Sequence, residues 1–216
     1  MNNLHRLVQA KAKQTRIKRL VDWDKSEVQV KKMFIEIEND QVNGEYLIKD
    51  EIKHTLSKII RYFVSADCYN ANKGLFLFGS YGVGKTTIFK IIRKMLAIAG
   101  GVQYNVNGFQ QVSLEKIISD YKKEGDIRRY SYGLNENPLH LCIDEFGKPI
   151  NEKIYGTSAV EIINSLMMVR YEILSFGYVN HATSNFAPDK LDLPDSLMDR
   201  MKEMFNFISI DGESYR

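Results

Sequence analysis

Residues 79–86 read Gly79-Ser80-Tyr81-Gly82-Val83-Gly84-Lys85-Thr86, which matches the pattern G-x-x-x-x-G-K-[ST] of a phosphate-binding loop. The glycines of such a loop let the backbone turn its N–H groups onto phosphate oxygens. A lysine in the place of Lys85 neutralises charge on the β- and γ-phosphates, and a hydroxyl in the place of Thr86 holds Mg²⁺. The sequence therefore predicts that ATP and Mg²⁺ bind at Gly79, Ser80, Tyr81, Gly82, Val83, Gly84, Lys85, Thr86 and Thr87.

The residues on either side of this loop have the pattern that a nucleotide site requires. Residues 74–78 form a short apolar run and predict a buried strand. After the loop, apolar residues recur on one face of a helix, at Ile88, Ile91, Ile92, Met95 and Leu96. Gly100 and Gly101 are expected to end that helix. A strand, a loop and a helix in this order favour a nucleotide site over a glycine turn without a ligand.

The composition indicates one α/β domain with a short extension. A chain of 216 residues is long enough to bury a core without disulfides or zinc, and its two cysteines, Cys68 and Cys142, lie far apart. With no signal peptide and no long apolar run, we expect a cytoplasmic protein that does not enter a membrane. Residues 1–20 carry six basic side chains and no acidic one, although the net charge of the whole chain is only +3. This basic segment suggests either an anionic partner or a solvated tail.

The order of the segments predicts a parallel sheet. Residues 1–49 form an extension, with an alternating pattern at 33–38 and a turn at Asn43-Gly44, and residues 50–216 form an ATPase domain that begins with a helix over 50–66. Five short apolar runs predict strands at 74–78, 102–105, 139–143, 178–183 and 205–210. Helical patterns near 111–124, 157–175 and 194–203 separate most of them. Alternating strands and helices imply a parallel sheet with helices on both faces and ligands at the carboxyl ends of its strands.

Two carboxylates follow the run at 139–143. The first, Asp144, would hold Mg²⁺ together with Thr86, and the second, Glu145, would orient and deprotonate an attacking water. The alternative is an Asp-Glu pair that caps the next helix. A water-activating base at this place argues against a small-molecule kinase.

Polar residues at the end of the run at 178–183 are candidates to sense the terminal phosphate. An amide at Asn185 can hydrogen-bond the γ-phosphate or the attacking water, whereas a simple turn at the end of a strand would explain the same residues.

Two arginines are candidates to stabilise charge during phosphoryl transfer. Arg200, in the helix before the last strand, can point into the site of a neighbouring copy, or it can pair on the surface with Asp195 or Asp199. Arg170 is the second candidate, for which a structural pairing is favoured.

Together these motifs resemble those of the AAA+ ATPases, and within them the helicase-loader branch, the DnaC/DnaI family, with IstB-like transposition helpers as relatives. The resemblance covers about residues 50–216. Three stretches carry the narrower likeness: Lys73–Gly79 leading into Gly82–Thr86, Arg170-Tyr171-Glu172 leading into Ala182–Phe186, and Asp199-Arg200-Met201 followed by Ser214-Tyr215-Arg216.

The resemblance implies a role for each matching residue. Asp144 and Glu145 would form the Walker B pair, Asn185 would be sensor 1, and Arg200 would be a finger that acts in trans. Arg216 would be a sensor-2-like residue that contacts the nucleotide, although its own terminal carboxylate could weaken its charge. The implied fold is a five-stranded parallel P-loop (ASCE/AAA+) sheet sandwiched by helices, without a C-terminal helical lid, an absence that fits this branch.

The implied task is to bind a hexameric replicative DNA helicase and place it on single-stranded DNA, as a homo-oligomer that forms on nucleotide or partner binding. Residues 1–49 are assigned to partner binding by position alone. Residues 122–132 mix cations with aromatic rings, as in single-strand binders, or form an exposed charged loop. Two other functions stay open: an IstB-like transposition helper that binds duplex DNA and a transposase, and a nucleotide-gated adaptor with little hydrolysis.

Overall fold

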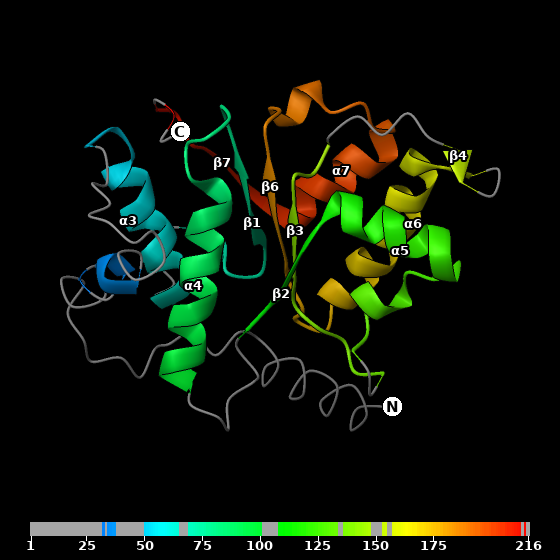
Figure 1. Ribbon diagram of the computed structural model, residues 1–216, viewed down its shortest axis with the longest axis horizontal. Helices are drawn as coiled ribbons and strands as arrows, with labels where there is room; N and C mark the ends of the chain where they lie inside the picture. The colour runs from blue at the N-terminus through cyan, green and yellow to red at the C-terminus, as the bar shows by residue number, and fades with distance from the viewer. Residues whose placement is uncertain are drawn as a thin grey trace, which may run out of the picture.

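The computed structural model of the protein describes residues 32, 34–37, 50–64, 69–100, 108–133, 136–147, 153–154, 157–212 and 214. Its centre is a sheet of five parallel strands in the order β2-β3-β6-β1-β7 (Figure 1). The strands are β1 (Gly74–Phe78), β2 (Gln110–Ser113), β3 (Leu141–Asp144), β6 (Asn180–Ser184) and β7 (Phe205–Ser209). This sheet confirms the α/β class and the parallel arrangement expected from the sequence.

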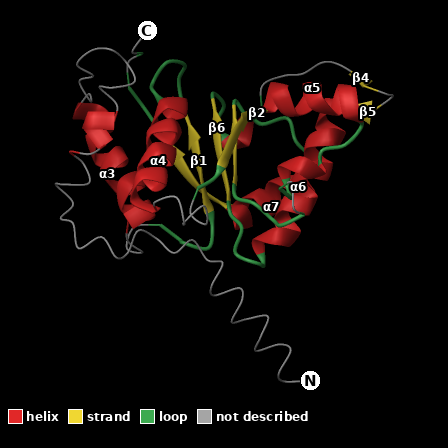
Figure 2. Ribbon diagram, turned by 60° about the horizontal axis from the view of Figure 1, so that its bottom comes forward, coloured by secondary structure: helices red, strands yellow, loops and turns green. Residues whose placement is uncertain are grey.

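Helices cover both faces of the sheet. One face carries α3 (Asp50–Val64) and α4 (Lys85–Gly100), and the other carries α5 (Leu114–Glu124), α6 (Ala159–Leu174) and α7 (Asp195–Met204) (Figure 2). The central strand serves both layers, because Leu75 and Leu77 pack with α3 and α4 whereas Phe76 packs with the opposite helices. Among the described segments, no helix combines the length and the apolar character needed to cross a membrane.

The remaining described elements are short. They are the 3₁₀ turns η1 (Arg128–Tyr130) and η2 (Pro188–Lys190) and an antiparallel ribbon of β4 (Lys153–Ile154) and β5 (Thr157–Ser158). The ribbon has strands of two residues each, too short to give a pattern in the sequence.

The second strand of the sheet differs from the expectation. Residues 110–113 form β2 beside β3, although the helical pattern was expected to begin near residue 111. The helix starts only at Leu114, because the Ser113 hydroxyl accepts a hydrogen bond from Lys116 N at 3.1 Å and caps it. The strand has a single apolar residue and lies at the sheet edge, so it lacks the apolar pattern of a buried strand. The strand expected at 102–105 lies outside the described residues.

The alternating pattern at 33–38 falls partly on described residues. Residues 34–37 are helical, and Phe34 and Ile37 pack in the same apolar cluster as Ile52 and Leu56 of α3. Spacing of three residues places both on one helical face, while Ile35 between them is exposed. The turn at Asn43-Gly44 and residues 1–31 lie outside the described residues, and the boundary at residue 50 stays a prediction.

Arg170 of α6 is fully buried and holds the amino ends of two strands together. Its guanidinium donates to the side-chain oxygen of Asn180 and to the carbonyl oxygens of Leu139 (2.7 Å), Val179 (3.3 Å) and Tyr130 (3.4 Å). Burial lowers its pKa to about 9. All four acceptors are neutral and fixed in the protein, so the structure supports the structural role for Arg170 over a role in phosphoryl transfer.

Two buried histidines lie in the strand region as neutral acceptors. His181 Nδ1 accepts a hydrogen bond from Leu75 N at 3.0 Å, and its ring lies among the rings of Phe63, Phe89 and other aromatic residues. His140 Nδ1 accepts one from Val179 N at 3.1 Å. Burial lowers the pKa of His181 to about 3 and that of His140 to about 4.

These pKa values predict loss of stability in mild acid. The unfolded chain takes up protons on both histidines as the pH falls below about 6.5, whereas the folded chain does so only near pH 4 and below. The free energy of unfolding should therefore change only slightly between pH 7.5 and 7 and decrease steadily from pH 6.5 to 4.5. Urea unfolding at these pH values measures it, and a constant free energy down to pH 4.5 would contradict neutral buried imidazoles.

Candidate nucleotide-binding site

The predicted phosphate loop lies between the carboxyl end of β1 and α4, and Thr86 and Thr87 fall in the first turn of that helix. Gly79, Gly82 and Gly84 have φ values of 141°, 78° and 89°. These are conformations that residues with a Cβ rarely adopt. A Cβ on Gly79 would lie 2.2 Å from the carbonyl oxygen of Ile210, so a side chain there would collide with the backbone after β7. The glycines are therefore required by the shape of the loop and by its close neighbours.

Lys85 is buried and folds back over its own loop. Its Nζ donates to the carbonyl oxygens of Gly79 (2.8 Å) and Ser80 (2.7 Å). Burial lowers its pKa to about 8, and the nearby charge of Asp144 opposes part of this effect. The lysine is thus a desolvated cation held by two neutral carbonyl groups at the loop. An anionic phosphate is a better partner for such a cation than a carbonyl oxygen.

The two carboxylates lie where the sequence placed them, at the carboxyl end of β3. Thr86 Oγ1 donates a hydrogen bond to Asp144 Oδ1 at 2.8 Å, which connects the start of α4 with β3. Because the Thr86 hydroxyl uses its hydrogen in this hydrogen bond, the lone pairs of Thr86 Oγ1 remain available to a cation. The donor set is one of oxygens, the ligand type that Mg²⁺ prefers. Thr86 and Asp144 therefore fit the predicted metal.

Glu145 begins a turn with an unusual backbone. Its φ is 56°, in the left-handed region, and Gly147 two residues later has a φ of 81°. The Glu145 N–H donates to Thr183 Oγ1 at 3.0 Å, and Phe146 N donates to the Thr183 carbonyl oxygen at 2.7 Å. The candidate base is thus held in a strained turn by the neighbouring strand.

Sequence reasoning missed Thr183, whose hydroxyl also donates to Asp144 Oδ1. Asn185, the residue predicted in that segment, lies just after β6 and is half-buried. The signal that could have found Thr183 is its hydroxyl at the end of the predicted strand at 178–183, which lies beside the strand that ends in Asp144. Because β6 lies between β1 and β3, the ends of all three strands meet at one edge of the sheet.

Arg200 lies away from this edge. Its helix α7 ends at Met204, and the following Phe205 pairs with Gly74 at the amino end of β1, opposite the phosphate loop. The Arg200 guanidinium donates to the Ser196 carbonyl oxygen and lies 5.8 Å from the centre of the Tyr171 ring. Asp199, one of its alternative partners, pairs with Lys202. The structure thus keeps Arg200 apart from the phosphate loop of its own chain, and Arg216 lies outside the described residues.

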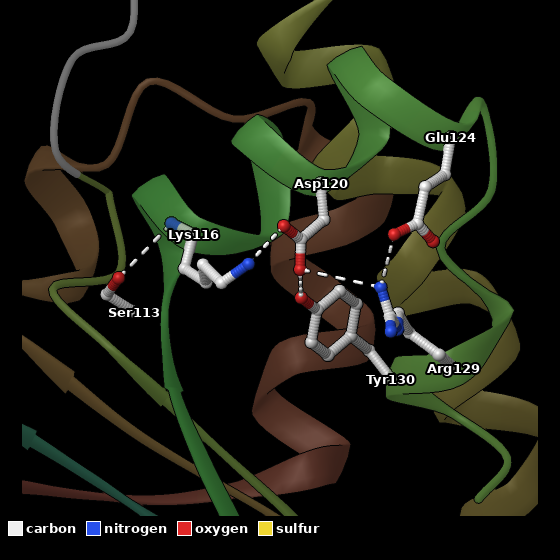
Figure 3. Close-up of polar contacts among 6 residues, drawn as sticks. All are labelled: Ser113, Lys116, Asp120, Glu124, Arg129 and Tyr130. Carbon is white, nitrogen blue, oxygen red and sulfur yellow. Dashed lines mark hydrogen bonds and ion pairs between the residues drawn. The ribbon is translucent and has the colours of Figure 1, made fainter. Parts of the chain in front are cut away.

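The segment at 122–132, predicted to mix cations with stacking rings, is largely tied into the fold. Tyr130 is buried and donates to Asp120, which also accepts from Lys116 and lies 3.7 Å from Arg129 (Figure 3). Arg129 pairs with Glu124 at 2.7 Å. Tyr130 therefore cannot serve as a platform for bases, and the cations that remain well exposed in this segment include Lys122, Lys123 and Arg128.

Comparison with solved structures identifies the fold. The crystal structure of the DnaC helicase loader matches with a TM-score of 0.58 and 20% identity, over 77% of this chain and 94% of that chain. The strand order of the sheet is also that of the AAA+ core. The chain has the AAA+ fold.

Two further structures share this AAA+ fold. A primosome component from Streptococcus pyogenes serotype M3, assigned provisionally, matches with a TM-score of 0.54 and 17% identity over 78% of this chain and 84% of that one. AMPPCP-bound DnaA from Aquifex aeolicus matches with a TM-score of 0.51 and 15% identity over 77% of this chain. The chain spans about half of that DnaA, 49%. Neither the protein-family models nor the curated proteins give a match.

The burial of Lys85 predicts that this residue serves ligand binding at some cost to stability. Lys85→Met removes a desolvated ammonium, and the two carbonyl groups it leaves lie on half-buried and exposed residues that water can reach. Without nucleotide, the free energy of unfolding of Lys85→Met should therefore lie between about 0.5 kcal/mol below and about 1 kcal/mol above the wild-type value. The stabilisation by Mg·ADP should disappear.

Thermal unfolding with and without Mg·ADP measures both effects. Lys90 is an exposed lysine on the same helix, and Lys90→Met is the control, which should keep the stabilisation by nucleotide. A large loss of stability in Lys85→Met without ligand would show that the lysine is mainly structural.

Proposed function

We propose that this protein is an ATPase that binds ATP at residues 79–87 and hydrolyses it with Glu145 as general base. The observation that carries the proposal is the contact between Thr86 and Asp144, because it joins the phosphate loop to the carboxylate pair. The likeness to AMPPCP-bound DnaA, whose ligand is an ATP analogue, gives further support. The proposed cofactor is Mg²⁺, and when bound it would neutralise charge on the β- and γ-phosphates.

The residues of the chain divide the work as follows. The loop N–H groups and Lys85 bind the phosphates, and Lys85 exchanges its contacts with the Gly79 and Ser80 carbonyl groups for phosphate oxygens. Thr86 and Asp144 hold the metal. Glu145 takes a proton from the attacking water, and Asn185 orients that water or contacts the γ-phosphate.

We propose that Arg200 completes the site of a neighbouring copy. The geometry that supports this is the position of Arg200 on α7, stacked beside Tyr171 and not beside its own phosphate loop. The isolated chain then lacks the cation that an arginine finger provides, which is typically worth ~10³–10⁵ in rate. Hydrolysis should be slow in the monomer and faster in a homo-oligomer.

The larger task we propose is that of a helicase loader, which binds a hexameric replicative helicase and places it on single-stranded DNA. Support comes from the match to the DnaC helicase loader over 94% of that chain. Further support comes from positive charge that suits the phosphates of a nucleic acid. It lies on the six basic side chains within residues 1–20 and on Lys122 and Lys123 at the end of α5.

A second candidate is a nucleotide-gated adaptor that hydrolyses little ATP. The observation that favours it is again the position of Arg200, because a chain that never pairs with a copy of itself keeps an incomplete site. Glu145→Gln separates the two functions: in a working ATPase it abolishes turnover and delays release of the partner, and in an adaptor it changes neither.

Mixing two inactive variants tests whether Arg200 acts in trans. Glu145→Gln lacks the base but keeps the finger, and Arg200→Ala lacks the finger but keeps the base. Each alone should hydrolyse ATP at least about 100-fold more slowly than the wild type under assembling conditions. An equal mixture should recover between about a tenth and a half of the wild-type rate, because some interfaces then pair an intact base with an intact finger.

The control for this experiment is Arg93→Ala, an exposed arginine on α4, which should keep the wild-type rate. A wild-type rate for Arg200→Ala alone, or no recovery on mixing, would reject the assignment of Arg200.

Size-exclusion chromatography with light scattering tests the proposed partner. The chain should co-elute with the hexameric replicative helicase of its own host in the presence of ATP, and the complex should change in mass or dissociate with ADP. Lys85→Ala, which should not bind nucleotide, should show no difference between ATP and ADP. If the wild type never co-elutes with the helicase but does so with a transposase on duplex DNA, the function is that of a transposition helper.

A further inference from the structure

We propose that Thr183 is a positioning residue that fixes Asp144 and Glu145 relative to each other, an inference that rests on the proposed ATPase function of this site. Its hydroxyl makes two hydrogen bonds, one as a donor through its hydrogen and one as an acceptor through its oxygen. It donates its one proton to Asp144 Oδ1 and accepts the Glu145 N–H at 3.0 Å. One side chain therefore sets both the carboxylate assigned to the metal and the backbone of the assigned base.

The position of Thr183 makes this arrangement rigid. The residue is 1% exposed, and its backbone pairs with Leu77 of β1 in the sheet. Its carbonyl oxygen accepts from Phe146 N at 2.7 Å, so both its backbone and its side chain contact the segment 144–146. A buried residue in the central sheet has little freedom to move, and the segment after β3 must follow it.

The backbone of Glu145 needs such support. A left-handed conformation is unfavourable for a residue with a Cβ, as Glu145 is. The hydrogen bond that Glu145 N donates to the Thr183 hydroxyl offsets part of this cost. Removing the Thr183 hydroxyl while keeping its volume would leave the Glu145 turn without this bond and favour an ordinary backbone conformation. The Glu145 side chain would then leave the backbone in a different direction, and its carboxylate would lie in a different place.

The orientation of Asp144 also depends on two hydroxyls. Oδ1 accepts from both Thr86 and Thr183. Thr86 belongs to the phosphate loop and is assigned to the metal, so its contact with Asp144 must adjust when ligands arrive. Thr183 has no such second task, and it can keep Asp144 in place through the cycle. Partners of this kind behind a metal site typically change metal affinity or activity by 10–100-fold when they are removed.

The test compares three substitutions at this position. Thr183→Val removes the hydroxyl at nearly constant volume, Thr183→Ala removes it without an added methyl group, and Thr183→Ser keeps it. Two quantities are measured for each: kcat and KM for ATP under assembling conditions, and the affinity for a fluorescent ADP analogue with Mg²⁺ and with EDTA. Thermal unfolding selects the variants that are folded at the assay temperature.

We expect Thr183→Val and Thr183→Ala to reduce kcat by about 10–100-fold and to weaken nucleotide binding with Mg²⁺ by about 10-fold. The affinity for nucleotide in EDTA should stay within about twofold of the wild-type value. The reason is that the Thr183 hydroxyl contacts Asp144 and the Glu145 backbone and reaches the phosphate loop only through Asp144. Thr183→Ser should restore both values to within about threefold. Ser131→Ala, which removes a buried hydroxyl from the segment after η1, should match the wild type.

The outcomes separate this inference from the proposed function. If the wild type does not bind nucleotide at all, the ATPase proposal fails, and this inference fails with it. If the wild type binds nucleotide and Thr183→Val, Thr183→Ala and Thr183→Ser behave alike, the inference is wrong and the ATPase proposal stands. If the wild type binds without hydrolysis, the difference between the Mg²⁺ and EDTA affinities still decides the role of Thr183.

Discussion

The hydrogen bond from Thr86 to Asp144 is the contact on which the rest of the site depends. It joins residues 58 positions apart, one at the start of α4 and the other at the end of β3. The parallel sheet makes this contact possible, because β1, β6 and β3 are neighbours and their carboxyl ends meet at one edge. The phosphate loop, the carboxylate pair and Thr183 each follow or end one of these three strands, so the pairing of the strands assembles the site.

Two cationic side chains of this protein, Arg170 and Lys85, are buried, and their hydrogen-bond partners suit them to different roles. Arg170 and Lys85 both lose water, and both have pKa values lowered by burial. Arg170 donates to four neutral acceptors in strands, turns and loops that are fixed, which leaves no place for a ligand. Lys85 donates to two carbonyl groups of a glycine loop, and phosphate oxygens can replace them. The difference lies in the partners and not in the depth of burial.

Sequence patterns predicted most of the sheet, and the clearest signals were the apolar runs of β1, next to the glycine loop, and of β3, next to the carboxylate pair. The predictions of β1, β3, β6 and β7 and of the helices α3, α4, α6 and α7 are confirmed within a few residues. They failed at β2, where the pattern itself is weak because β2 is a mostly polar edge strand. Within the alternation at 33–38, residues 34–37 are helical, and Phe34 and Ile37 are buried. The roles given to Asn185, Arg200 and Arg216 remain predictions.

The sequence by itself determined the loop at 79–86, the Asp144-Glu145 pair and the α/β order of segments, because these features depend on residues that lie close together along the chain. Only the tertiary structure decided that Thr183 contacts the Asp144 carboxylate and the Glu145 backbone N–H, that Tyr130 is buried against Asp120, and that Arg200 stacks on Tyr171. Contacts across strands and between helices depend on register and packing, and a single sequence does not specify which of several hydroxyls, rings or arginines will meet a given partner.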